Sequence, residues 1–150
     1  MNKMGALSLY ERDFFAWTQE QAKLIKEKSL DKLDLVNLLE EVESMGKHEK
    51  RELGNRLAIL LMHLLKWKFQ PTHRGVSWEL TIKEQRSELL HHLKENPSLT
   101  NPAYLTETFE HAYEIAVLKA SKETKLSQNA FPAVCEWDVS QVLDSKFFPN

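Results

Sequence analysis

The sequence has few turn residues and no apolar run long enough to cross a membrane. Among its 150 residues are only 4 glycines and 5 prolines, too few to punctuate a many-stranded sheet. The longest apolar stretch, residues 57–65, is interrupted by His63 and followed by Lys66 and Lys68. A transmembrane helix needs about 20 apolar residues. These shortages favour long helices and argue against a membrane protein.

The chain also has a single cysteine and no excess of either charge. Cys135 has no partner for an intrachain disulfide, which indicates a reducing compartment. No apolar run with a small-residue cleavage site follows Met1. The formal net charge is −2, so no global basic field attracts a polyanion. We therefore expect a cytoplasmic protein. General affinity for nucleic acid is disfavoured, and a local basic patch is the alternative.

The rest of the composition is an ordinary globular mixture. Hydrophobic residues make up 42% and charged residues 28% of the sequence, proportions at which a chain folds instead of staying disordered. A length of 150 residues suits one continuous core without a disulfide or a metal. We therefore expect a single helical domain over residues 1–150.

One segment, RELGNRLAILLMHLLKWKFQ at residues 51–70, is the centre of the expected fold. Between Leu57 and Leu65 its only polar residue is His63, and a helix that is apolar all round has to be buried. The expected fold class is therefore all-α. We predict an irregular bundle of about five helices around a central buried helix, plus a short C-terminal helix.

Capping residues and helix breakers set the expected boundaries. Ser8 and Asp34 are N-cap candidates for the first two helices, and Asp138 is one for the last. Pro71 ends the central helix. Gly46 separates the second and third helices, with a continuous helix as the alternative because glycine costs only about 1 kcal/mol there. The expected helices cover residues 8–27, 34–46, 47–70, 77–96, 101–126 and 139–144, and the second has the apolar stripe Leu35, Leu38, Leu39, Val42 and Met45.

Three of the apolar stripes each contain one polar residue: Gln21, His63 and Gln85. Each of these lies one or two helical turns from a tryptophan. An amide or imidazole buried without a partner costs a few kcal/mol, so the three groups would meet if their stripes face a common core. We prefer a hydrogen-bonded network that fixes helix register, and a ligand-lined cavity is the alternative.

Glu40 and Glu43 together with His63 suggest a metal site, because helical bundles place carboxylates and imidazoles inward on facing helices. The spacing is against it. Di-iron bundles repeat Glu-x-x-His on single helices, and the sequence has no such repeat. We interpret His91 and His92 as solvent-facing, and we assign no metal and no cofactor.

No catalytic motif is recognisable. Ser44, Ser77 and Cys135 lack both a nucleophile elbow and a histidine at an informative spacing. A glycine-rich phosphate loop is also absent from the sequence. We therefore name no catalytic residue, and whether the protein is an enzyme stays open.

The middle of the chain is locally basic and follows an acidic stretch. Arg74 and Arg86 lie near the turn at Pro71, where the start of the next helix offers unpaired N–H groups to an anion. The other reading is pairing with the acidic stretch, and exposed pairs of this kind add less than about 1 kcal/mol each. We prefer internal pairing, and the two arginines are the candidates for any anionic ligand.

Four stretches and the ending of the chain resemble one family. The stretches are YERDFFAWTQEQ (10–21), DLVNLLEEVESMG (34–46), HLLKWKFQP (63–71) and RGVSWELTIKEQR (74–86), and the ending is FPAVCEWDVSQVLD. In this order they are similar to the bacterial domain of unknown function 29 family, over nearly the whole chain. The resemblance implies a small all-helical bacterial protein whose biochemical role is not established. Trp137-Asp138 departs from the pattern, since members more often have an aromatic residue followed by threonine there.

We expect a non-enzymatic interaction or regulatory module, because catalytic motifs are absent and aromatic residues are abundant. The alternative is an enzyme, or a protein that binds a small ligand or metal through the polar cluster around His63. The expected partner is another protein, and the sequence does not indicate the oligomeric state. The candidate binding cluster, whose members all belong to the family pattern, consists of Gln21, Glu40, Glu43, His63, Trp67, Gln70, Arg74, Trp78, Gln85 and Arg86.

Overall fold

The computed structural model describes residues 6–150, and these form two compact units. Helices account for 78% of the residues that the structure describes, and no strand occurs among them, which confirms the all-α fold class. The first unit ends at Lys47 and the second begins at His48. The expectation of a single domain over residues 1–150 stays a prediction. No helix within residues 6–150 combines the length and apolar character that crossing a membrane requires.

The first unit contains α1 (Leu9–Arg12), α2 (Phe14–Lys26) and the beginning of α3 (Leu35–Phe69). Ser8 caps α1 as predicted, its hydroxyl accepting the N–H of Glu11 at 3.3 Å. The predicted single helix over residues 8–27 is nevertheless wrong. Asp13 leaves the helical conformation, and its carboxylate accepts the N–H of Ala16 at 3.0 Å, so a second helix begins one residue after α1 ends.

Helix α3 is 35 residues long and runs through Gly46 without a break. The predicted boundary at Gly46 is therefore wrong, and the continuous alternative is correct. The helix begins where the sequence indicated, because Asp34 accepts the N–H of Asn37 on its carboxylate and that of Leu38 on its carbonyl. Gly46 has open space where a Cβ would lie, so neither packing nor backbone geometry forces the chain to turn there.

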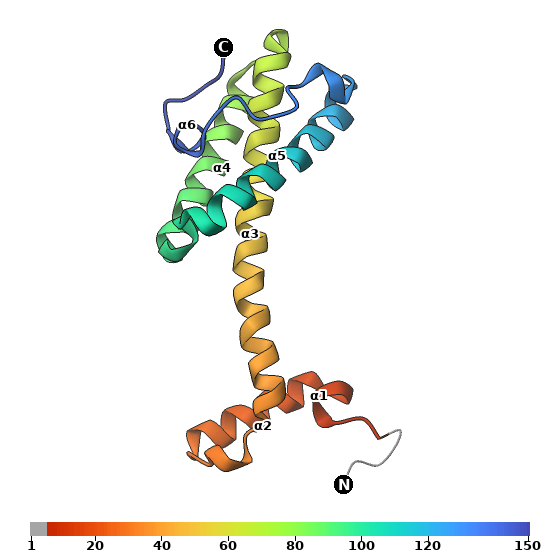
Figure 1. Cartoon of the computed structure of the whole chain (residues 1–150), viewed down its shortest axis with the longest axis vertical. Coiled ribbons are helices and arrows are strands. Elements are labelled where there is room, and N and C mark those ends of the chain that lie inside the picture. The colour runs from red at the N-terminus through yellow and green to blue at the C-terminus, as the bar shows by residue number, and fades with distance from the viewer. Residues whose placement is uncertain (1–5) are drawn as a thin grey trace. The chain divides into compact units, whose positions relative to one another are not determined.

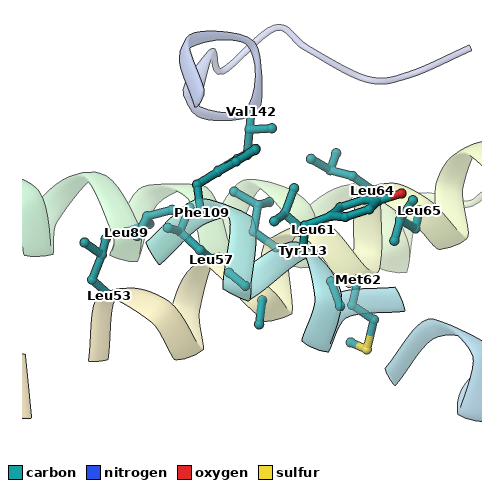
Figure 2. Packing of buried hydrophobic residues seen from close by; sticks show 14 of the residues in the cluster. Leu53, Leu57, Leu61, Met62, Leu64, Leu65, Leu89, Phe109, Tyr113 and Val142 are labelled. Atoms are coloured by element: carbon teal, nitrogen blue, oxygen red, sulfur yellow. The ribbon is translucent and has the colours of Figure 1, made fainter. Parts of the chain in front are cut away.

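In the second unit the C-terminal part of α3 packs against α4 (Val76–Glu95) and α5 (Pro102–Thr124) (Figure 1). This confirms that the segment predicted to be central is buried. Figure 2 shows Leu57 and Leu61 of α3 close to Phe109 and Tyr113 of α5 in the core. The buried residues of α3 are Leu53, Leu57, Ala58, Leu60, Leu61, Met62, Leu64 and Leu65.

The C-terminal segment covers this core with isolated apolar side chains. As predicted, Asp138 caps a short helix, α6 (Val139–Leu143), in a reciprocal capping box with Gln141. Val142 of α6 is fully buried, and Phe131 is nearly so. The segment therefore completes the second unit although most of its residues are not helical.

Candidate functional site

Arg86 is buried in the second unit, with 2% of its surface exposed. Its guanidinium donates to three backbone carbonyls of the C-terminal segment: Val142 at 2.9 Å, Ser145 at 3.4 Å and Phe147 at 2.9 Å. Burial lowers the pKa of Arg86 and Asp144 raises it, but a guanidinium stays charged in proteins. The carbonyl oxygens replace the water that this charge loses on folding.

Arg74 holds the same segment at a second point. Its Nε donates to the carbonyl of Trp67 at 2.6 Å, and a terminal nitrogen donates to the carbonyl of Pro149 at 3.4 Å. The guanidinium also lies 5.2 Å from the centre of the Trp67 ring, which packs against Phe148. The structure therefore brings Trp67, Arg74 and Arg86 together around the C-terminal segment, with both guanidinium groups bonded to backbone carbonyls.

His63 is half-buried on α3, one turn before Lys66. Burial lowers the pKa of His63 and the charge of Lys66 lowers it further, while Glu123 opposes the shift. Lys66 donates to Glu123 at 3.0 Å and lies 4.8 Å from the centre of the Trp78 ring. His63 is therefore neutral at pH 7 and borders an ion pair between α3 and α5.

The two glutamines of the cluster in this unit, Gln70 and Gln85, are both half-buried. Trp78 is half-buried as well and stacks on His73 with the ring centres 6.1 Å apart. None of these residues lines the hollows beside Tyr113 or the one beside His92.

Gln21 belongs to the first unit, where it is one of two buried residues of α2. Its amide oxygen accepts the N–H of Asp34 at 2.9 Å, and the indole N–H of Trp17 donates to the Asp34 carboxylate at 3.0 Å. The bonds from Asn37 and Trp17 lower the pKa of Asp34 against the opposing effect of burial. Gln21 and Trp17 thus fix the start of α3.

Glu40 and Glu43 are exposed on α3, and neither forms an ion pair with another described residue. Their neighbour Glu41 instead accepts the phenolic hydrogen of Tyr10 in a short hydrogen bond. This bond, with burial and nearby carboxylates, raises the pKa of Tyr10 to about 12. Within residues 6–150 no group of three His, Cys, Asp or Glu side chains is placed to hold a metal ion.

One buried polar residue, His92, was not expected from the sequence. His92, interpreted as solvent-facing, is 8% exposed, and its Nε2 lies 3.1 Å from the carbonyl oxygen of Glu49 on α3. The adjacent His91 is exposed and pairs with Glu95 at 2.6 Å. The available signal was spacing, because His92 lies three residues after the inward-facing Leu89 and His91 lies two after it.

The second missed feature is an exposed apolar face at the beginning of α3. Four of the five residues of the predicted stripe, together with the neighbouring Val36, have 60% to 79% of their surface exposed, whereas the stripe was expected to be part of the bundle. The remaining member of the stripe, Leu38, is half-buried. Single exposed apolar residues are common, but contiguous ones mark interaction sites. These five, which we call the α3 face, are Leu35, Val36, Leu39, Val42 and Met45.

The arrangement supplies little for nucleophilic chemistry. Burial raises the pKa of the Cys135 thiol above its usual range, against a backbone hydrogen bond from Trp137 that lowers it, so little thiolate forms at pH 7. Burial also raises the pKa of Tyr113 to about 12, and its hydroxyl donates to the carbonyl of Pro132 at 2.6 Å.

Comparison with known proteins identifies a family but no individual relative. No curated protein and no solved structure matches the chain. One family model, described as a domain of unknown function, matches residues 9–148, from the first residue of α1 to the C-terminal segment held by Arg74 and Arg86. A match over nearly the whole chain shows that the protein belongs to the DUF29 family.

Proposed function

We propose that this protein is a non-enzymatic interaction module that binds another protein through the α3 face. The observation that carries the proposal is the exposure of all five side chains of that face, each at 60% or more. Removing a Leu or Val side chain from water contributes about 1.5 to 3 kcal/mol when burial is complete. A partner that covers several of them gains enough to form a specific complex.

The α3 face has the geometry that a partner helix recognises. Leu35, Leu39 and Val42 follow the spacing i, i+4, i+7 and lie on one side of the helix. The opposite side is occupied within the first unit, where Glu41 bonds to Tyr10 and Asp34 to Trp17. Pairing of such a face with an amphipathic helix is a recurring mode of recognition.

The charges beside the face indicate what kind of helix fits. Val36, Glu40 and Glu43 follow the same spacing along the edge of the face, and the two carboxylates have no ion-pair partner among residues 6–150. Carboxylates at the rim attract Lys or Arg and repel acidic partners. The expected partner is an apolar helix flanked by basic residues.

A second copy of this chain meets the charge requirement poorly. Residues 35–46 contain Glu40, Glu41 and Glu43 but no Lys or Arg. Two copies paired over this stretch gather six carboxylates and no base, and like charges brought together at an interface cost several kcal/mol. The proposal is therefore binding to a different protein.

The enzyme alternative has less support. The two arginines that would bind an anionic substrate, Arg74 and Arg86, donate to the backbone carbonyls of the terminal segment. His63 stands beside the Lys66–Glu123 pair and lacks a neighbouring nucleophile. The cluster therefore supports a structural role in the second unit.

Site-specific photo-crosslinking in the cells of origin tests the proposal. A photoreactive residue replaces Val36 or Val42 in the α3 face, and the matched control position is Lys119, which is exposed on α5. We expect one adduct of defined mass from the α3 positions and none from residue 119. The same adduct should disappear when Leu39→Asp is added, while the exposed position of Leu39 leaves the melting temperature unchanged.

Two results would overturn the proposal. One is a lack of any adduct at both α3 positions. The other is an adduct with twice the mass of the chain, which would make the face a self-association surface.

A further inference from the structure

We propose that the second unit has a separate docking site, a groove along α5 that takes an extended basic and apolar peptide segment of another protein. The groove consists of two hollows with volumes of about 580 and 530 Å³. They follow one another along α5 and share Tyr113, Glu114 and Ala133 in their linings. Volumes of this size accommodate one or more side chains of a bound peptide.

The groove exists because the chain after α5 returns over that helix at one point. Tyr113 of α5 donates to the carbonyl of Pro132 at 2.6 Å, which fixes the returning segment across the helix. The first hollow lies toward Phe109 and Val139, and the second toward Val117 and Gln128. The anchoring tyrosine is only 4% exposed and lines both hollows, so its packed ring separates them.

The charge of the groove is of one sign. Its two linings contain the carboxylates of Glu110, Glu114 and Asp138 and contain no Lys or Arg. Among residues 6–150, the one ion-pair partner of these carboxylates is the largely exposed His111, whose Nδ1 is 3.8 Å from Glu114. The groove therefore offers three negative charges beside apolar walls.

Other carboxylates of the same elements are already neutralised. Glu123 of α5 receives a hydrogen bond from Lys66, and Glu136 receives one from Lys68 at 2.9 Å. Among the described residues no lysine or arginine pairs in this way with Glu110 or Glu114. Glu107, on the same helix but outside the groove, also has no ion-pair partner among the described residues. The carboxylates of Glu110 and Glu114 at the rim are therefore available to an external cation.

These features select the occupant by charge complementarity. A Lys or Arg of the partner lies against the rim carboxylates, and its neighbouring apolar side chains enter the hollows beside Phe109 and Val134. Val134 is 79% exposed in the unoccupied chain, so it loses contact with water on binding. This site is independent of the α3 face, which belongs to the first unit.

Cys135 provides a reporter because it lines the first hollow and is the chain's only cysteine. The experiment measures its alkylation rate by iodoacetamide while a short peptide of alternating Lys and Leu is titrated. A peptide with Glu in place of each Lys is the charge control. We expect saturable protection by the Lys peptide and none by the Glu peptide.

Variants identify the groups responsible. Glu110→Gln combined with Glu114→Gln should raise the apparent Kd roughly tenfold and remove most of its salt dependence. Glu107→Gln, on the same helix but outside both hollows, should leave the Kd unchanged. Val42→Asp in the α3 face should also leave the Kd for the groove unchanged. A negative result for the groove is therefore distinguishable from a negative result for the α3 face.

The groove proposal is overturned if neither peptide slows alkylation at millimolar concentration. Equal protection by both peptides would overturn it as well. So would a Kd that is the same in the variant with both Glu110→Gln and Glu114→Gln as in the wild type. Thermal unfolding of each variant checks that the second unit is intact.

Discussion

Arg86 can be buried because the C-terminal segment supplies backbone oxygens where its guanidinium needs them. Three carbonyls accept from it, and its ring neighbour is Phe148 at 5.7 Å. A buried charge without such partners would cost several kcal/mol. Arg86 therefore couples α4 to a segment more than fifty residues later in the chain.

Removing this guanidinium should destabilise the protein strongly. Arg86→Met keeps the apolar stem but leaves three carbonyls without donors, and we expect a loss of about 3 kcal/mol in the free energy of unfolding. Urea denaturation measures it. Lys83→Gln, an exposed change on the same helix, should cost less than about 0.5 kcal/mol. Equal stability of the two variants would contradict this role for Arg86.

His63 should make stability depend on pH in a defined direction. Burial lowers its pKa in the folded chain, so the unfolded chain, with a pKa of about 6.5, binds the proton more tightly. The stability that neutral His63 contributes to the folded state is fully present above about pH 6.5. It is lost as the pH falls through the pKa of His63 in the folded chain.

His63→Gln removes this dependence while preserving a polar side chain of similar size. Between about pH 8 and pH 5 the wild type should lose more unfolding free energy than the variant, because only the wild type has the histidine that the unfolded chain protonates more easily. Chemical denaturation at both values measures it. A difference that is the same at both pH values would show that His63 does not titrate differently on folding.

The residue types of the cluster were recognisable in the sequence, but their partners were not. Arg74 and Arg86 bond to backbone carbonyls, which every residue has, so no side-chain pattern reveals them. His92 was misread because its acceptor is the carbonyl of Glu49 on another helix. The spacing of His92 from Leu89 indicated an inward-facing side chain, but a distant backbone acceptor such as the Glu49 carbonyl leaves no pattern in the sequence.

Helix α3 differs from its expected form because Gly46 does not stop it. With no tertiary contact at the Cβ position of Gly46, the helix loses only intrinsic propensity there. Gly46→Ala should therefore stabilise the protein by about 0.5 to 1 kcal/mol. Urea denaturation together with slower amide exchange around residue 46 checks this. A destabilising alanine would mean that the helix ends at Gly46.

Helix starts were easier to predict than helix continuity. Asp34, Asn101 and Asp138 each accept an N–H at the start of a helix, as local sequence indicates. Asp13 was missed because the apolar period continues across it, from Tyr10 to Phe14 and Trp17. Caps are encoded within a few residues, whereas whether one helix continues past an internal capping residue such as Asp13 depends on tertiary packing.

The two units differ in how much apolar surface they bury. Every residue of the main buried cluster lies in the second unit, whereas the described part of the first unit buries only Trp17 and Gln21. We expect backbone amides of residues 14–41 to exchange with solvent faster than those of residues 53–65. Hydrogen exchange with mass spectrometry measures both segments in one sample. Equal protection would contradict the unequal cores.

The exposure of the apolar side chains on α3 could not be predicted from the sequence. Leu35, Leu39 and Val42 have the spacing of a core-facing stripe, and the period is the same whether the face meets its own core or a partner. The sequence therefore predicted the helix and its apolar side but not their exposure. Exposure depends on which other elements reach the first unit, and no local pattern encodes that.

Sedimentation equilibrium of charge-matched mixtures tests most directly the claim that the α3 face binds a basic-flanked helix. Wild type alone should remain at 17.5 kDa, because two copies bring only carboxylates together. A variant with Glu40→Lys and Glu43→Lys provides an apolar face with basic flanks, and its mixture with wild type should form a species of twice that mass. Adding Val42→Asp to either chain should abolish it. A wild-type dimer, or a mixture that stays monomeric, would contradict the account.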